Sequence, residues 1–228
     1  MLDAFLGFLP RLLDGLWITL GLLVLSAAGG LCLGILIALA GISKYRILRL
    51  ISQLYRAVFR SIPGLVVLYF VYYGIAQLEV VRESPFWALF RHAYWCAWLA
   101  LSINDGAFTS ELLYGAIKSV PQGCQQASAA LGMSPMKTLW LIQIPIALRL
   151  VFPAYTTELI FLTKTTSIVS TITLMDLMGA ADILYKETFD PFLPLISAGL
   201  FYGLLIWLIT NLSAFIESRA FRYPNIQT

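Results

Sequence analysis

Five long apolar stretches divide the chain, at about residues 16–40, 58–78, 93–117, 147–170 and 193–216. A helix needs about 20 mostly apolar residues to cross a hydrocarbon core of about 30 Å, so each stretch can span a bilayer with some tilt. A backbone inside lipid must satisfy its own hydrogen bonds, and strand-like alternation is absent. The pattern predicts an all-α integral membrane protein with about five transmembrane helices, forming a single domain over residues 1–228.

Basic residues are spread unevenly over the segments between these stretches. If five helices cross, ten basic side chains lie on one side and four on the other. The ten are Lys44, Arg46, Arg49, Arg56, Arg60, Lys118, Lys137, Arg149, Arg219 and Arg222, and the four are Arg11, Arg82, Arg91 and Lys186. Because Lys and Arg concentrate in cytoplasmic loops, we expect the N-terminus outside, the C-terminus in the cytoplasm and residues 1–15 as a short interfacial segment.

Composition agrees with a membrane location and excludes other classes. Hydrophobic residues make up 60% of the chain and charged residues 12%, with a mean hydropathy of +0.83. In soluble domains, apolar residues make up roughly 45–50% of the chain and charged residues about 25%. A net charge of +3 without a basic stripe gives no footprint for nucleic acid. The three cysteines and one histidine have no metal-ligand spacing, so we expect the chain itself to hold no cofactor.

Signatures of nucleotide and hydrolytic chemistry are absent from the sequence. There is no Gly-x-x-x-x-Gly-Lys-Ser/Thr loop, so the chain does not bind ATP by that route. There is no Gly-x-Ser-x-Gly nucleophile elbow either. We therefore expect a protein that is not an enzyme.

The segment at about residues 121–145 is too short and too polar to span. Pro121 and Pro145 bracket it, and because proline lacks a backbone donor and clashes with the preceding turn, we expect each to end a flanking helix. Between them, residues from Gln126 to about Leu141 favour one short helix with small residues on one side. Such a helix suits docking against a protein partner.

This segment also carries a spaced pattern. It resembles the signature loop of binding-protein-dependent ABC transporter permeases, which reads Glu-Ala-Ala, three residues, Gly, nine residues, Ile, one residue and Leu-Pro. The matching positions are Gln126, Ala127, Ser128, Gly132, Ile142, Ile144 and Pro145. The spacing agrees throughout, while Gln126 replaces the acid, Ser128 the second alanine and Ile144 the leucine.

The resemblance implies a type I ABC importer permease fold in a bacterial inner membrane. In that family the loop holds a coupling helix seated on the ATPase, so the matching residues are candidates for ATPase coupling. The implied partners are an ATPase dimer that holds ATP and Mg, a periplasmic amino-acid-binding protein and a second permease subunit. The substitutions in the loop favour a homologous sibling, and thus a heterodimer, over a second copy of this chain.

Shorter matches extend over nearly the whole chain. Arg60-Ser-Ile-Pro63, Glu111 and Lys164-Thr-Thr-Ser-Ile168 resemble motifs of polar amino acid permeases, and the chain is most similar to the permease subunits of the histidine/lysine/arginine/ornithine importer. The resemblance implies import of basic amino acids by alternating access, coupled to ATP hydrolysis in a partner. Glu111 and Lys164 occupy positions shared across the subfamily, which favours structural or gating roles for them.

Ionisable residues within the apolar stretches are candidates for substrate contact, because each costs about 2.5–3.5 kcal/mol at mid-membrane. Thr157 and Glu158 stand where similar importers of basic amino acids have an Asn-Glu pair, so Glu158 could meet a cationic group. Asp105 shares a helix face with Thr109 and would add a second acid. The alternatives are a packing hydrogen bond between subunits for Glu158 and a basic partner from another subunit for Asp105.

Two further questions stay open in the sequence. Gly30 and Gly34 form a GxxxG step, which serves either an interface between permease helices or packing within the chain. The chain is alternatively a permease for neutral or acidic amino acids, a stand-alone secondary transporter, or a membrane enzyme using Asp105 and Glu111. Repeated halves typical of many secondary transporters are absent, and no nucleophile or metal site accompanies the enzyme hypothesis.

Overall fold

The computed structural model describes residues 2–220, with side chains for residues 7–219, and every regular element in that range is helical. The long helices are α1 (Leu2–Ile42), α2 (Arg46–Ser61), α6 (Ala93–Ser119), α9 (Ile144–Thr165) and α11 (Phe192–Ala220). The shorter pieces are α3 (Gly64–Tyr69), η1 (Phe70–Gly74), η2 (Ile75–Gln77), α4 (Glu79–Arg82), α5 (Trp87–Phe90), α7 (Gln122–Ala130), α8 (Pro135–Thr138), η3 (Leu139–Gln143), η4 (Thr166–Ile172) and α10 (Leu177–Thr188). The prediction of an all-α protein is confirmed.

Among the described residues, three helices are long and apolar enough to cross a membrane, or up to four if a bent pair counts as one span. The three are Gly7–Ile42, Pro135–Ile172 and Phe192–Arg219, and the bent pair joins Arg46–Ser61 to Gly64–Gln77 at 104°. The remaining predicted stretch, at about residues 93–117, lies in α6. This helix has 27 residues and is long enough to cross a membrane, but it is more polar than the three helices above. A crossing by α6, and with it the total of five, stays a prediction.

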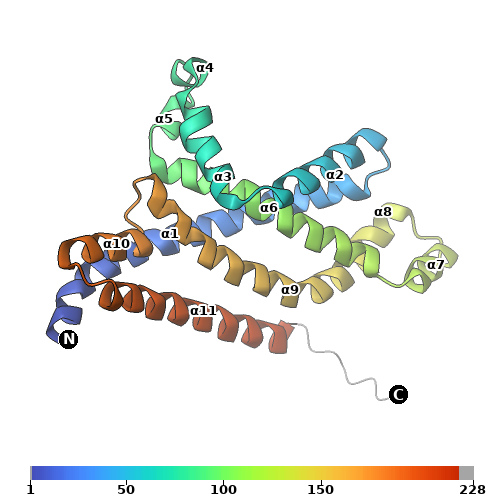
Figure 1. The fold of residues 1–228 in the computed structure, drawn as a ribbon. Coiled ribbons are helices and arrows are strands. Elements are labelled where there is room, and N and C mark those ends of the chain that lie inside the picture. Colours follow the sequence, from blue (N-terminus) through green and yellow to red (C-terminus); the bar gives the residue numbers. More distant parts are fainter. Residues whose placement is uncertain (1, 221–228) are drawn as a thin grey trace.

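Helix α6 can be polar because protein covers much of it. It packs along α1 (Figure 1), with Asp105 and Thr109 buried against that helix. Opposite them stand Gly30 and Gly34, where an added Cβ would overlap the Asp105 carboxylate or the Thr109 side chain. Only glycine allows the two backbones to approach so closely. The GxxxG step is therefore a contact within the chain.

The segments rich in basic residues gather toward one end of the molecule. Figure 1 shows the α1–α2 junction, α7, α8 and the C-terminal end of α11 toward the right, and the start of α1, α5 and α10 toward the left. This arrangement matches the two groups of loops inferred from charge, although Arg222 lies outside the described residues. Which end faces the cytoplasm stays a prediction. Residues 2–15 of the expected interfacial segment are the first part of α1, which continues through Pro10 to Ile42, and residue 1 lies outside the described residues. An interfacial position for this part stays a prediction.

A buried carboxylate and the backbone N–H next to it join three helices at the end away from α7. Asp176 caps α10 by accepting a hydrogen bond from the Gly179 N–H at 2.9 Å. It also accepts one from the Tyr202 hydroxyl of α11 at 3.2 Å. The Leu177 N–H donates to the Thr19 hydroxyl of α1 at 3.1 Å. These bonds fix α10 between α1 and α11, since each satisfies a polar group removed from water.

The loop at residues 121–145 holds two short helices where one was expected. Pro121 does separate α6 from α7, as predicted. However, α7 begins four residues earlier than the expected start at Gln126 and ends at Ala130, so the prediction of one helix to about Leu141 is wrong. The reason is Gly132, whose φ of 73° lies in the left-handed region that ends helices.

Pro145 does not end a helix, which corrects a second expectation. Helical structure continues from Pro135 to Ile172, and Pro145 lies in the first turn of α9. The turn before it, η3, is a π-helix. A proline cannot donate to the carbonyl four residues back, and a π-turn is one way for a helix to absorb that missing bond.

The α1–α6 contact gives a first testable prediction. Gly30→Ala adds a methyl group where the Asp105 carboxylate lies, and overpacking of this kind costs about 1–3 kcal/mol. We expect Tm of the purified protein to fall by about 5 °C in a fluorescence melt. Gly203→Ala in α11 is the control, because nothing lies within 4 Å of its added Cβ. Equal Tm values for the two variants would contradict the proposed close contact.

Candidate functional site

A bend between α2 and α3 opens a cleft of about 530 Å³. The bend arises because Pro63 has no N–H to continue α2, so α2 ends at Ser61 and α3 begins at Gly64. We call this space the break cleft. Its lining residues are Arg60, Ser61, Ile62, Pro63, Gly64, Leu65, Asn104, Phe108, Phe161, Lys164, Thr165 and Ile168.

Helix α6 supports the break cleft with side chains on the face turned away from α1. Asn104 donates from Nδ2 to the Phe59 carbonyl at 3.1 Å, which satisfies an acceptor near the end of α2. Phe108 lies 6.2 Å from Phe161 of α9, measured between ring centroids. The cleft is therefore held between α2, α6 and α9.

A second cleft, of about 550 Å³, lies between α2 and α6. We call it the basic cleft, because most of its polar lining side chains are cationic. Its lining residues are Gly41, Arg49, Gln53, Arg56, Ala57, Arg60, Glu111, Tyr114 and Lys118.

One carboxylate organises the basic cleft. Glu111 Oε2 accepts from Arg56 Nη1 at 2.9 Å and from Arg60 Nη1 at 3.2 Å. The Arg56 guanidinium also lies over the Tyr114 ring, 4.0 Å from its centroid. Glu111 of α6 is thus bonded to the neighbouring helix α2.

The arginine partners of Glu111 were missed at the sequence level. Arg56 and Arg60 are four residues apart, so they share one face of α2. That face also includes Arg49, one heptad before Arg56. An amphipathic helix with arginines at this spacing, followed by Pro63, is the signal that would have identified them.

Glu158 is partly buried and makes no hydrogen bond or ion pair with the part of the chain that the structure describes. Its carboxylate is close enough to Arg60 and to Asp105 for the charges to interact. Thr157 is exposed and donates to the Pro153 carbonyl of its own helix at 3.4 Å. Neighbouring residues in a helix point about 100° apart, so the two side chains cannot face the same spot.

Asp105 is 2% exposed and lines neither cleft. It accepts a hydrogen bond from the Thr109 hydroxyl at 3.4 Å, which confirms that the two share a face. Its second oxygen has no hydrogen-bond partner among the described residues. The structure thus brings Asp105 near Glu158 but seats it against Gly30. Direct substrate contact by Thr157, Glu158 or Asp105 stays a prediction.

The predicted coupling residues lie along the α7–α8 loop and the start of α9. Gln126, Ala127, Gly132 and Pro145 are exposed, and Ile142 is partly buried. Ser128 is buried instead, and it accepts a hydrogen bond from the Thr138 hydroxyl at 3.2 Å. Ser128 therefore ties α7 to α8. ATPase contact by this set stays a prediction.

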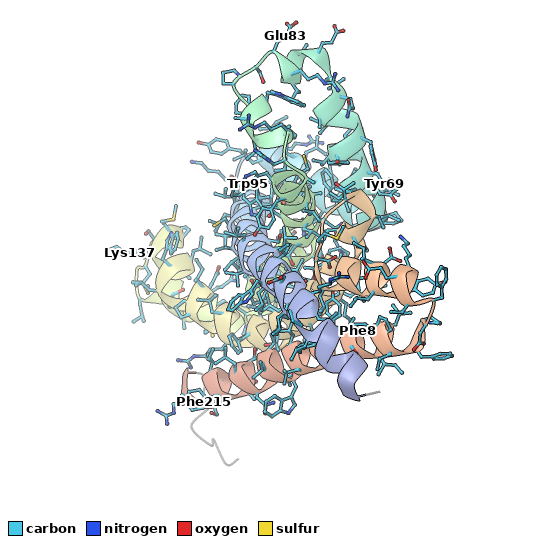
Figure 2. The ribbon with its side chains drawn as sticks, turned by 90° about the vertical axis from the view of Figure 1, so that its left-hand side faces the viewer. Phe8, Tyr69, Glu83, Trp95, Lys137 and Phe215 are labelled. Carbon is cyan, nitrogen blue, oxygen red and sulfur yellow. The ribbon has the colours of Figure 1, made fainter. Side chains whose placement is uncertain are left out.

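Large apolar side chains on the same loop were not singled out from the sequence. Leu131 is 80% exposed, and Met136, Trp140 and Leu141 are also exposed. Figure 2 shows Lys137 of α8 at the periphery, beside these residues in sequence. Exposed apolar groups next to charged ones are typical of protein interfaces. The signal available in the sequence was apolar residues inside a segment too polar to span.

Comparison with known proteins gives one family. The model of the family described as "Binding-protein-dependent transport system inner membrane component" matches residues 30–222. The octopine transport system permease protein OccM of Rhizobium radiobacter is 38% identical over 206 residues, covering 90% of this chain and 84% of that protein. The arginine ABC transporter permease protein ArtM of Escherichia coli K12 is 35% identical over 217 residues, covering 95% of this chain and 97% of that protein.

A solved structure has the same fold. It is the crystal structure of an amino acid ABC transporter with histidines, with a TM-score of 0.84 and 29% identity. The match covers 94% of this chain and 96% of that chain. The predicted type I importer permease fold is confirmed.

The arginine–carboxylate cluster gives a second testable prediction. The Arg56 side chain is 9% exposed and bonded to Glu111, so Arg56→Gln leaves that carboxylate with the weaker Arg60 contact. We expect a loss of about 2 kcal/mol, below the values for fully buried pairs because Glu111 is 38% exposed. Arg49→Gln is the control, since Arg49 is exposed and bonds loop carbonyls. A denaturation melt in which both variants lose equal stability would contradict this ranking.

Proposed function

Because the chain belongs to the family of binding-protein-dependent transport system inner membrane components, we propose that it is the permease subunit of an ABC importer that carries basic amino acids into the cytoplasm. Two relatives named for octopine and arginine transport support this proposal. So does Glu158, a partly buried carboxylate without a direct partner among the described residues. An ionisable group at such a cost in the membrane indicates a functional role.

The break cleft and the neighbouring part of α9 together offer opposite charges for the two ends of a basic amino acid. Lys164 lines the cleft and suits the substrate carboxylate. Glu158 does not line the cleft, but its charge interacts with that of Arg60, and this carboxylate suits the cationic side chain. Thr157 points to another side of the helix and can contribute only indirectly. Asp105, whose charge also interacts with that of Glu158, adds negative potential without lining the cleft.

The transport cycle needs energy from another subunit. The exposed α7–α8 loop, with Gln126, Ala127, Gly132 and Leu131 on its surface, is the docking surface that we assign to an ATPase dimer. That dimer binds ATP and Mg, and this chain is non-catalytic. The remaining partners are a periplasmic amino-acid-binding protein and a second permease, which we expect to be a homologous sibling.

One observation favours a second substrate class. Arg60 and Lys164 are both cations on the wall of the break cleft, which is what an acidic amino acid would require. Exchange of Glu158 separates the two possibilities, because a cationic substrate needs this carboxylate and an anionic one is repelled by it.

Glu158→Gln tests the substrate proposal. We expect ATP-driven uptake of arginine by the reconstituted importer to fall at least about tenfold, since a charge-assisted hydrogen bond is lost. Uptake of citrulline, the uncharged analogue, should stay within twofold. Glu79→Gln on α4 is the control, because Glu79 is exposed and far from the cleft along the chain. Faster glutamate uptake with unchanged arginine uptake would favour the acidic substrate instead.

Leu131→Asp tests the docking surface. A charge placed in an apolar interface is costly, so we expect the ATPase subunit to be lost when the permease is purified by an affinity tag. Val80→Asp is the matched control, because Val80 is 82% exposed on α4 at a distance from the α7–α8 loop. ATPase retention by Leu131→Asp would argue against this surface. Uptake without any ATPase subunit would overturn the importer proposal altogether.

A further inference from the structure

Arg60 is the residue that the break cleft and the basic cleft share. It occupies the last turn of α2, immediately before the bend at Pro63. Its guanidinium lies over the ring of Phe108, 5.8 Å from the centroid, and Phe108 in turn contacts Phe161. A single cationic side chain therefore separates the two spaces, next to an aromatic pair.

The charges around Arg60 do not balance on the basic-cleft side. Arg56 and Arg60 share the single carboxylate of Glu111. Arg56 holds the shorter contact, is the more buried and also donates from Nε to the Ser52 carbonyl at 3.3 Å. Arg60 has the longer contact and a side chain that is 43% exposed. Arg60 thus carries the surplus positive charge.

A carboxylate without a direct partner among the described residues, Glu158, lies on α9, away from the basic cleft. Glu158 has no hydrogen bond or ion pair within the described residues, and Arg60 is the cation whose charge reaches it. Glu158 and Phe161 are three residues apart on α9, so they share a face next to Phe108. Arg60 is consequently bonded to Glu111 and, from beyond ion-pair distance, is attracted by the charge of Glu158.

We propose that Arg60 is a resident counter-ion of Glu158 that a cationic substrate must displace. With substrate bound, Glu111 alone retains the guanidinium; after substrate leaves, the charge of Arg60 again partly offsets that of Glu158. This competition weakens binding of the cation, and a transport site must bind weakly enough to release its cargo. Arg60 is in this sense a specificity residue. The inference rests on the proposed function, because it assumes that Glu158 receives the cationic group.

The test measures equilibrium binding of radiolabelled arginine to the assembled importer in nanodiscs, without nucleotide or binding protein. We expect Arg60→Gln to lower Kd for arginine about tenfold, within the usual range for coupling between sites. Kd for citrulline should change less than twofold, and Arg60→Lys should resemble the natural protein. Arg60→Met is measured in parallel, because its apolar stem can keep the packing on Phe108 if Gln does not.

The double variant distinguishes this inference from the proposed function. In Glu158→Gln protein, Arg60→Gln should no longer change Kd for arginine. If Glu158→Gln weakens arginine binding but neither Arg60 variant without charge strengthens it, the counter-ion role fails and the proposed function stands. Equal effects on arginine and citrulline would likewise overturn it, because they indicate a steric role. If Glu158→Gln leaves arginine binding unchanged, the substrate proposal fails and the inference fails with it.

Discussion

Close packing of α1 against α6 is the contact on which the other helices depend. Gly30 and Gly34 let α6 approach until Asp105 and Thr109 lie on the α1 backbone. With that face fixed, Asn104, Phe108 and Glu111 must point toward α2 and α9. The break cleft then forms where α2 ends before Pro63, and the basic cleft forms farther back between α2 and α6. Small residues on one helix thus determine where polar groups on another are exposed.

Charge compensation in this protein is shared among helices rather than made in isolated pairs. Glu111 neutralises one of two arginines, and the remaining positive charge is next to Glu158. Burying an ion alone in a low-dielectric region is unfavourable. The arrangement leaves one cation and one carboxylate able to exchange partners, whereas Arg56 is held by Glu111, Tyr114 and a backbone carbonyl. A basic amino acid would enter a site in which such an exchange is already available.

Helix continuity connects the loop surface to this site. The rod from Pro135 to Ile172 has 38 residues, about 57 Å at 1.5 Å per residue. Its first turns carry the exposed apolar residues beside α7, and its second half carries Glu158 and Lys164. The π-turn η3 before Pro145 and the 3-10 helix η4 at its end are irregular parts of the rod. A continuous helix therefore connects the loop to the break cleft.

The sequence by itself determined the membrane class, the positions of most spans and the spacing of the loop motif, because each depends on residues near one another in the chain. It also identified Glu111 and Glu158 as unusual, since their cost in an apolar stretch is local. The sequence-based prediction of one helix from Gln126 to about Leu141 was wrong, because Gly132 adopts a left-handed conformation and ends the first helix. Only the tertiary structure decided that α6 is covered by protein, that Gly30 meets Asp105, and that Arg56 and Arg60 share Glu111. Such contacts join distant residues, and no periodicity along one helix specifies which residue of another helix it will meet.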